Sequence, residues 1–156
     1  MACIKKVGRI GLDFSGMDAM ISNFSKIEKG DALRETAEKA LDESAEIVYQ
    51  AIKDAMSRAT INGKPVDWNR TGATKASLDE KYATVWETST QAYKPVGFNF
   101  KAGGIPSVFL MHGTPRMKPN RALWEAVYGK KINQQVSEAQ KKIFEKELQN
   151  ILNGGG

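Results

Sequence analysis

The pattern of hydrophobic and polar positions divides the chain into a strand, a long helix, a group of strands and a final pair of helices. Near the N-terminus, Ile10, Leu12 and Phe14 alternate with polar or small residues, a period of two that is typical of a half-buried strand. Apolar residues then recur at helical spacing over residues 17–27, and Ser15 is placed to cap them. We therefore predict a strand followed by a short helix.

Residues 31–59 form the longest regular segment and contain neither Gly nor Pro. Their apolar positions follow one another at steps of three and four, which predicts a single amphipathic helix. The predicted buried stripe consists of Leu33, Ala37, Leu41, Ala45, Val48, Ile52, Ala55 and Ala59. The acidic residues lie mostly outside that stripe, at Glu35, Glu38, Asp42, Glu43 and Glu46. We interpret them as a solvated face of the helix rather than as a group of catalytic carboxylates.

Residues 60–90 divide into three parts that differ in composition. Residues 60–72 contain Asn-Gly and Gly-Lys-Pro, which predicts a loop. Residues 73–80 are read as a short polar turn. Residues 82–90 are rich in Thr, Val, Trp and Tyr, the residue types that suit a pleated surface, so a strand is predicted there.

A second strand is predicted after a turn near Gln91. Val96, Phe98 and Phe100 alternate with small or polar residues, and Pro95 suggests a position at the edge of the sheet. Residues 105–111 are apolar on both faces. That pattern fits either a buried strand or a turn of helix, and the residues alone leave the two alternatives open.

The C-terminal part predicts two helices, a short one over residues 121–128 that Gly129 ends and a second amphipathic one from about residue 132 to 152. The expected fold class is α+β, with one long helix packed on a small antiparallel sheet, a short N-terminal strand and helix, and the C-terminal helices. We expect residues 1–153 to form a single domain and residues 154–156 to form a flexible glycine tail.

The net charge of +5 comes entirely from the middle of the chain. Residues 60–131 hold eleven basic and five acidic side chains, and residues 91–122 hold five basic and no acidic ones. The predicted basic strip is Lys94, Lys101, Arg116, Lys118 and Arg121. Such a strip can face a phosphate backbone, an acidic protein surface or only solvent, and charge alone does not decide among the three.

The segment from His112 to Arg121 organises much of this picture. Gly113 can adopt a positive φ, while Pro115 and Pro119 restrict φ and lack an amide hydrogen. We therefore predict a stiff loop that carries Arg116, Lys118 and Arg121 away from an apolar base and grips a partner.

The residues that could carry chemistry are few. His112 is the only histidine and Cys3 the only cysteine, which excludes a metal site built on paired imidazoles or on cysteines. No Gly-x-Ser-x-Gly motif is present to supply a nucleophile for His112. We expect neither catalysis nor a cofactor. No apolar stretch approaches the roughly 20 residues of a membrane helix, and the N-terminus lacks the apolar core of a signal peptide, so no membrane partner and a cytoplasmic site of synthesis are expected.

Three short pieces of the chain carry a resemblance to a known family. The first is the strand and short helix over residues 10–24, followed directly by the long alanine-rich helix. The second is Arg70-Thr71-Gly72 with Lys75 and Ser77, and the third is His112-Gly113-Thr114 with Met117, Pro119 and Leu123. In this order the pieces resemble the tail-component family of long-tailed bacteriophages and prophages, whose members are tail-completion or head–tail joining proteins. The resemblance covers about residues 7–128.

The resemblance implies a structural virion protein without catalytic activity, located in the neck or tail and made in the host cytoplasm. It implies assembly as a ring, with a hexamer as the expected form, in contact with other neck and tail proteins and with DNA that passes through the channel without sequence-specific recognition. It leaves a tail-terminating and a head-closing role equally open. From these motifs and the stiff loop, the residues that we expect at the subunit interface are Arg70, Thr71, Gly72, His112, Gly113, Thr114, Pro115, Arg116 and Pro119.

An alternative reading of the residues is a small basic nucleic-acid-binding protein that uses residues 91–122. Tyr93, Phe98, Phe100 and Phe109 are interleaved with the basic strip and could in principle stack on bases. The alternation of the phenylalanines favours burial in the core instead.

Overall fold

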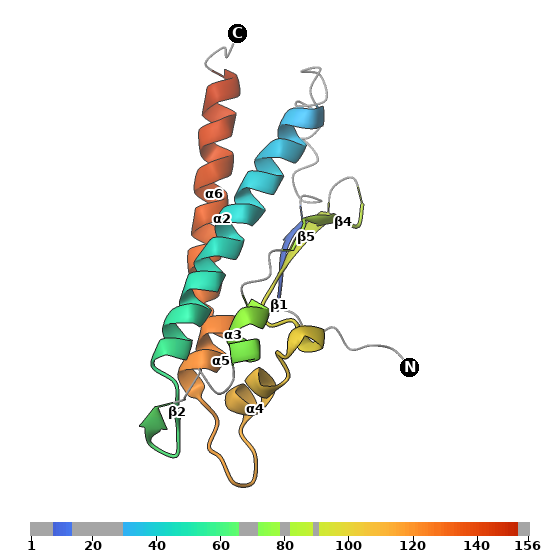
Figure 1. The fold of residues 1–156 in the computed structure, drawn as a ribbon. Coiled ribbons are helices and arrows are strands. Elements are labelled where there is room, and N and C mark those ends of the chain that lie inside the picture. The colour runs from blue at the N-terminus through green and yellow to red at the C-terminus, as the bar shows by residue number, and fades with distance from the viewer. Residues whose placement is uncertain (1–7, 14–29, 66–71, 79–81, 89–90, 153–156) are drawn as a thin grey trace.

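The computed structural model describes residues 8–13, 30–65, 72–78, 82–88 and 91–152. Two long helices, α2 (Gly30–Ser57) and α6 (Lys130–Leu152), run side by side in opposite directions. A small sheet lies against one side of α2, and the short helices gather near the C-terminal end of α2 (Figure 1). The predicted helix over residues 17–27 and the predicted glycine tail lie outside the described residues.

Helix α2 confirms the prediction of one long amphipathic element. The described members of the predicted stripe are buried, except for the half-buried Ala45. A second buried row that the stripe did not include consists of the small residues Thr36, Ala40 and Ser44. The Ser44 hydroxyl donates to the carbonyl oxygen of Ala40 at 2.6 Å, so this polar side chain is satisfied within its own helix. Small side chains on two neighbouring rows let other elements approach α2 closely.

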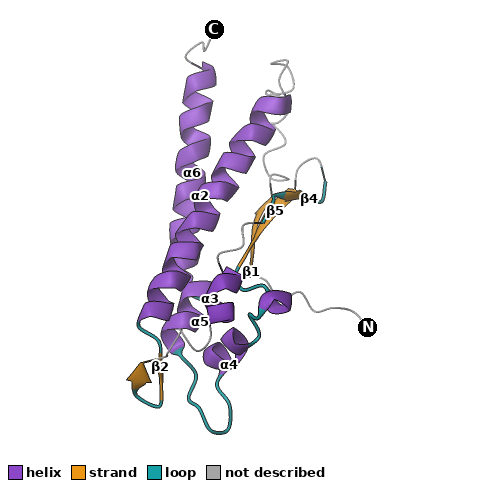
Figure 2. Ribbon diagram, in the orientation of Figure 1, coloured by secondary structure: helices purple, strands orange, loops and turns teal. Residues whose placement is uncertain are grey.

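The sheet consists of β1 (Gly8–Asp13), β4 (Val85–Trp86) and β5 (Gln91–Val96) in the order β1-β5-β4, with both pairs antiparallel. Both β1 and β5 contact α2, so the expected α+β class with a long helix on a small antiparallel sheet is confirmed (Figure 2). Of the strand predicted over residues 82–90, the described residues 82–88 pair with β5 only at Val85 and Trp86, so the strand is shorter than expected there.

The second predicted strand was placed too late in the chain. Strand β5 ends at Val96, and Gly97, with a φ of 139°, turns the chain out of the sheet. Phe98 is buried beyond the strand, whereas Phe100 begins the 3-10 helix η2 (Phe100–Ala102). The edge position predicted from Pro95 is also wrong, since β5 is the central strand. The proline is tolerated because the pairing with β4 ends at Tyr93, which leaves only β1 opposite Pro95.

Two segments read as loop or turn contain regular structure. Within residues 60–72, β2 (Thr60–Ile61) and β3 (Lys64–Pro65) form a hairpin around Asn62 and Gly63, both at positive φ, as a tight two-residue turn requires. The predicted polar turn over residues 73–80 is helix α3 (Gly72–Leu78) over its described part. Its buried hydroxyl groups are satisfied by backbone carbonyls, as in the 2.7 Å bond from Ser77 to Thr74, which lets a polar segment pack.

The open question over residues 105–111 is resolved as helix α4 (Pro106–His112). Pro106 occupies the first turn, where its missing amide hydrogen costs nothing, and Ser107, Leu110 and Met111 are buried. Phe109 points the other way, with 51% of its surface exposed, so its predicted burial is wrong. A strand would place alternate residues inward; burial at positions 107, 110 and 111 follows the helical period instead.

The two C-terminal helices confirm the prediction. Helix α5 (Arg121–Tyr128) ends at Gly129, and α6 follows at once. The main hydrophobic cluster joins the C-terminal half of α2 to α3, α4, α5 and the start of α6, through residues that include Ile52, Met56, Leu78, Phe98, Leu110, Leu123, Ile132 and Val136. Among the described helices, none combines the length and the apolarity that crossing a membrane requires.

Candidate interaction surface

The loop between α4 and α5, residues 113–120, extends beyond the end of the helical body (Figure 1). Its first residue, Gly113, has φ 75° and ψ 177°, a region that is open essentially to glycine alone. Its amide donates to the carbonyl oxygen of Phe109 at 2.8 Å. A Cβ atom at this position would lie 2.7 Å from the carbonyl oxygen of Met117. The glycine is therefore needed both for its conformation and for its small size.

The tip of the loop is a tight turn, Thr114–Met117. The amide of Thr114 donates to the carbonyl oxygen of Met117 at 2.8 Å, and the amide of Met117 donates back to the carbonyl oxygen of Thr114 at 3.0 Å. The Thr114 hydroxyl also accepts from the amide of Arg116 at 3.3 Å. Pro115 occupies the second position of the turn, where a fixed φ is favourable.

Two asparagines that the sequence did not single out hold the rest of the loop. The amide of Asn120 donates to the carbonyl oxygen of Leu110 at 2.7 Å, and its side chain accepts from the amide of Leu123 at 3.0 Å, which caps α5. From the β2–β3 hairpin, the side-chain amide of Asn62 donates to the carbonyl oxygen of Arg116 at 3.4 Å. Met117 packs against the hydrophobic cluster. The loop is thus fixed at its base, its tip and its exit, as the predicted stiffness requires.

The fixed backbone presents cations to solvent. Arg116 and Lys118 are exposed, and in the described part of the chain neither has an ion-pair partner. Arg121 is paired with Glu125 at 3.3 Å, but both side chains are largely exposed, so the pair adds little stability. Thr114, Pro115 and Pro119 are also exposed. The exposed His112 ends α4.

The predicted basic strip does not form one surface, because Lys94 lies elsewhere. Its side chain, 19% exposed, forms an ion pair with Asp42 in the middle of α2. From Asp42 to the end of α2 at Ser57 the helix extends about 22 Å. The hairpin that contacts the loop comes only after that end. Lys101 is exposed on η2, on a separate segment again.

The other predicted motif is only partly described. Arg70 and Thr71 lie outside the described residues, and Gly72 is the exposed first residue of α3. Helix α3 packs against η2, where the Thr74 hydroxyl donates to the carbonyl oxygen of Gly103 at 3.0 Å. Of the motif residues on α3, Ser77 is buried, whereas Gly72 and Lys75 are exposed.

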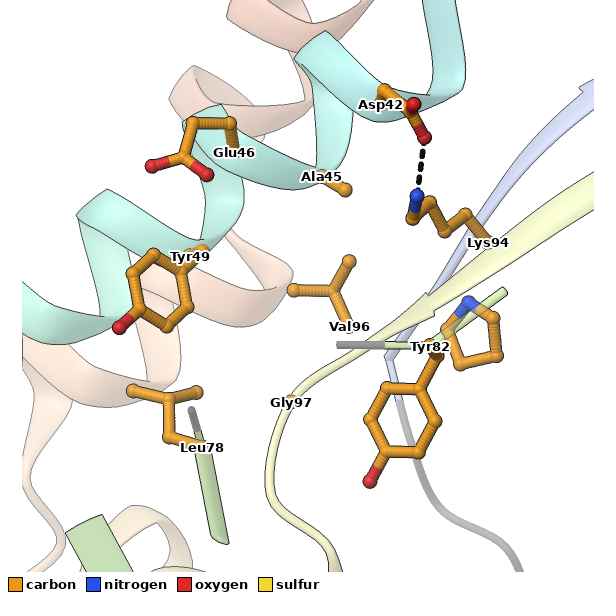
Figure 3. Close-up of a pocket in the computed structure, with 10 residues that line it drawn as sticks. Asp42, Ala45, Glu46, Tyr49, Leu78, Tyr82, Lys94, Val96 and Gly97 are labelled. Atoms are coloured by element: carbon orange, nitrogen blue, oxygen red, sulfur yellow. Dashed lines mark hydrogen bonds and ion pairs between the residues drawn. The ribbon is translucent and has the colours of Figure 1, made fainter. Parts of the chain in front are cut away.

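A pocket of about 460 Å³ lies between α2 and β5 (Figure 3). Helix α2 contributes Asp42, Glu46 and Tyr49, and the opposite side includes Tyr82, Lys94 and Val96. Positions 42, 46 and 49 are spaced four and three residues apart, so one face of the helix carries all three. The sequence shows that spacing. It does not show that β5 lies opposite this face of the helix, so it does not predict the pocket.

The carboxylates on this side of α2 differ in their partners. Glu38 accepts from the indole nitrogen of Trp86 at 3.1 Å, and Asp42 is paired with Lys94. Glu46 accepts from the neutral side-chain amide of Gln50 at 2.7 Å and has no ion-pair partner among the described residues. The pocket therefore combines one carboxylate that forms an ion pair with one that has no cationic partner among the described residues.

One further ion pair lies on α2, between Lys39 and Glu35 at 2.9 Å. The hydrogen bond and the charge of Lys39 lower the pKa of Glu35 below its ordinary value of 4.5. Both side chains are largely exposed, so this pair adds little stability.

Large apolar side chains are exposed on the short helices. Phe109 on α4 is 51% exposed, and Trp124 and Tyr128 on α5 are 41% and 42% exposed. The rings of Trp124 and Tyr128 contact each other, with centroids 5.7 Å apart. Exposed aromatic side chains of this size are typical of a surface that binds a partner.

His112 does not line the pocket between α2 and β5, and no group of three or more potential metal ligands occurs among the described residues. No protein-family model matches the chain, and no curated protein or solved structure is significantly similar to it.

Proposed function

We propose that this chain is a structural protein of the phage neck or tail that completes the tail or joins it to the head. It assembles with copies of itself into a ring, with six as the expected number, and contacts other neck and tail proteins. In this role it acts by binding and has no catalytic activity. The proposal takes its family and location from the sequence resemblance, and the geometry of the loop supports its mode of action.

The observation that carries the proposal is the fixed, protruding turn Thr114–Met117. A loop that only connects two helices does not need a glycine-specific backbone, reciprocal turn bonds and a clamp from a separate hairpin. A loop that binds a partner benefits from all three, because a preformed backbone loses less entropy on binding. The exposed, unpaired Arg116 at its tip provides the charge for recognition.

The substitution Arg116→Glu tests the proposal directly. It changes only an exposed side chain, so the fold should remain and the free energy of unfolding should change by about 0.5 kcal/mol or less. Assembly should be lost, which electron microscopy of the purified protein and complementation of a phage that lacks the gene both measure. The matched control is Lys101→Glu, an equal change of charge at an exposed site on η2. Infectious tails and normal rings from Arg116→Glu would contradict the proposed role of the loop.

A second candidate function is nucleic-acid binding, which the exposed aromatic rings of α4 and α5 and the exposed Arg116 and Lys118 favour. If Arg116 and Lys118 each contact a phosphate, DNA affinity falls as salt rises, with a slope of about −0.9 per contact. Replacing both by Glu should then reduce the slope by about 2 in a filter-binding titration. Absence of affinity at low salt would remove this candidate, whereas ring assembly without DNA would leave the structural role in place.

A further inference from the structure

We propose that the Thr114–Met117 turn of one copy binds in the pocket between α2 and β5 of a second copy. The inference rests on the proposed function, because it names the contact through which a ring would form. Arg116 of the first copy pairs with Glu46 of the second, and Pro115 packs against the rings of Tyr49 and Tyr82.

The turn is suited to be the inserted part. Its backbone is fixed before contact by the two bonds between Thr114 and Met117, and its tip consists of the exposed Pro115 and Arg116. A narrow, preformed tip of two residues enters a pocket with little loss of conformational entropy. The guanidinium group of Arg116 has donors in the planar arrangement that matches a carboxylate.

The pocket is suited to be the acceptor. Its volume of about 460 Å³ is in the range of sites that enclose a small ligand, roughly 300–1,000 Å³. Lys94 already compensates Asp42, so the carboxylate of Glu46 is the one that attracts a further cation. Tyr49 lies on the same side of the pocket, with Lys53 already 5.7 Å from its ring centroid, and Tyr82 lies on the opposite side, where its ring offers an aromatic face to a guanidinium or a proline. Figure 3 shows Glu46 and Tyr49 together on the α2 side.

The contact must join two molecules. The turn is hydrogen-bonded to the β2–β3 hairpin, which follows the C-terminal end of α2. The pocket lies at the middle of α2, roughly 20 Å from that end along the helix. A fixed turn cannot cover that distance within its own chain. Because the two surfaces lie at different places on each copy, the contact is head-to-tail, and repeated copies form a closed ring or an open filament.

Two variants in which the charge of the turn or of the pocket is reversed test the proposed contact. One variant carries Arg116→Glu and Lys118→Glu, which makes the turn acidic, and the other carries Glu46→Lys, which makes the pocket basic. Each variant alone should remain monomeric in sedimentation velocity at low salt, because like charges face each other. An equimolar mixture should assemble, since the acidic turn of one variant meets the basic pocket of the other and the unchanged pair completes the chain.

Two controls keep the result specific. Lys101→Glu and Glu43→Lys change the same charges at other exposed positions and should assemble like the unaltered chain. Circular dichroism and the melting temperature of every variant establish that it is folded. The proposed contact is overturned if the mixture assembles no better than its components or if either variant assembles alone. If the unaltered chain still assembles in that case, the proposed ring is kept and only this contact is rejected. If the unaltered chain does not assemble, the proposed ring is rejected as well.

Discussion

At the scale of single residues, the conformation of the loop between α4 and α5 is set mainly by a glycine and by hydrogen bonds of asparagine, and less by hydrophobic burial. Gly113 permits a backbone conformation closed to other residues, and Asn120 satisfies two backbone groups at once, one at Leu110 and one at Leu123. The glycine and the prolines could be recognised from the sequence, because their conformational limits are intrinsic. The role of Asn62 could not, because its partner is 54 positions away.

Gly113→Ala should destabilise the fold by about 1–3 kcal/mol, the usual cost of a side chain in this region of backbone space. The clash of the added Cβ with the carbonyl oxygen of Met117, 2.7 Å away, acts in the same direction. Urea denaturation measures the change. Gly72→Ala is the matched control, because a Cβ there meets no atom within 4 Å, and it should shift stability by less than about 0.5 kcal/mol. Equal effects at both positions would show that the backbone at Gly113 is not restrained.

At the scale of elements, the two long helices differ in how firmly they are held. Helix α2 has buried residues on one face along most of its described length, and it contacts the sheet, α5 and α6. Helix α6 has its buried residues Ile132 and Val136 in its first turns, and later apolar positions such as Ile143 and Leu148 are only half-buried. The periodic pattern predicted both helices equally well, because it reports the apolar face and not what covers that face.

Backbone amides should consequently exchange with solvent at different rates in the two helices. We expect the strongest protection around Ile52 of α2 and weak protection in α6 beyond Ile143, because local opening there exposes little buried surface. Hydrogen–deuterium exchange of the full chain, at a concentration where it is monomeric, measures this gradient. Uniform protection along α6 would contradict it and would indicate that the C-terminal half of the helix is covered.

At the scale of the whole molecule, charge is separated along α2. The exposed Glu46 lies near the middle of the helix, while the loop beyond its C-terminal end presents the exposed Arg116 and Lys118. A subunit with opposite charges at separate places favours head-to-tail contacts with its own copies, because each end complements the other. This arrangement is the physical basis for the proposed contact between the turn and the pocket.

Elements with local signals could be predicted from the order of the amino acids. The long helix, the last two helices and the first strand follow from hydrophobic periodicity, and the stiffness of the loop follows from its glycine and prolines. Segments without a clear period, such as residues 73–80 and 105–111, were misread or left open, because a short apolar or polar run has no periodicity that distinguishes helix from strand or turn.

The tertiary structure alone decided which distant residues meet. It separated Lys94 from the other predicted cations and paired it with Asp42, and it formed a pocket from one face of α2 and a strand some 50 positions later. Such outcomes depend on how whole elements pack against each other, and the free energy of that packing is spread over the buried core. For this reason charge counted along the chain suggested one basic strip, whereas the fold produced a cationic turn at one place and an acidic pocket at another.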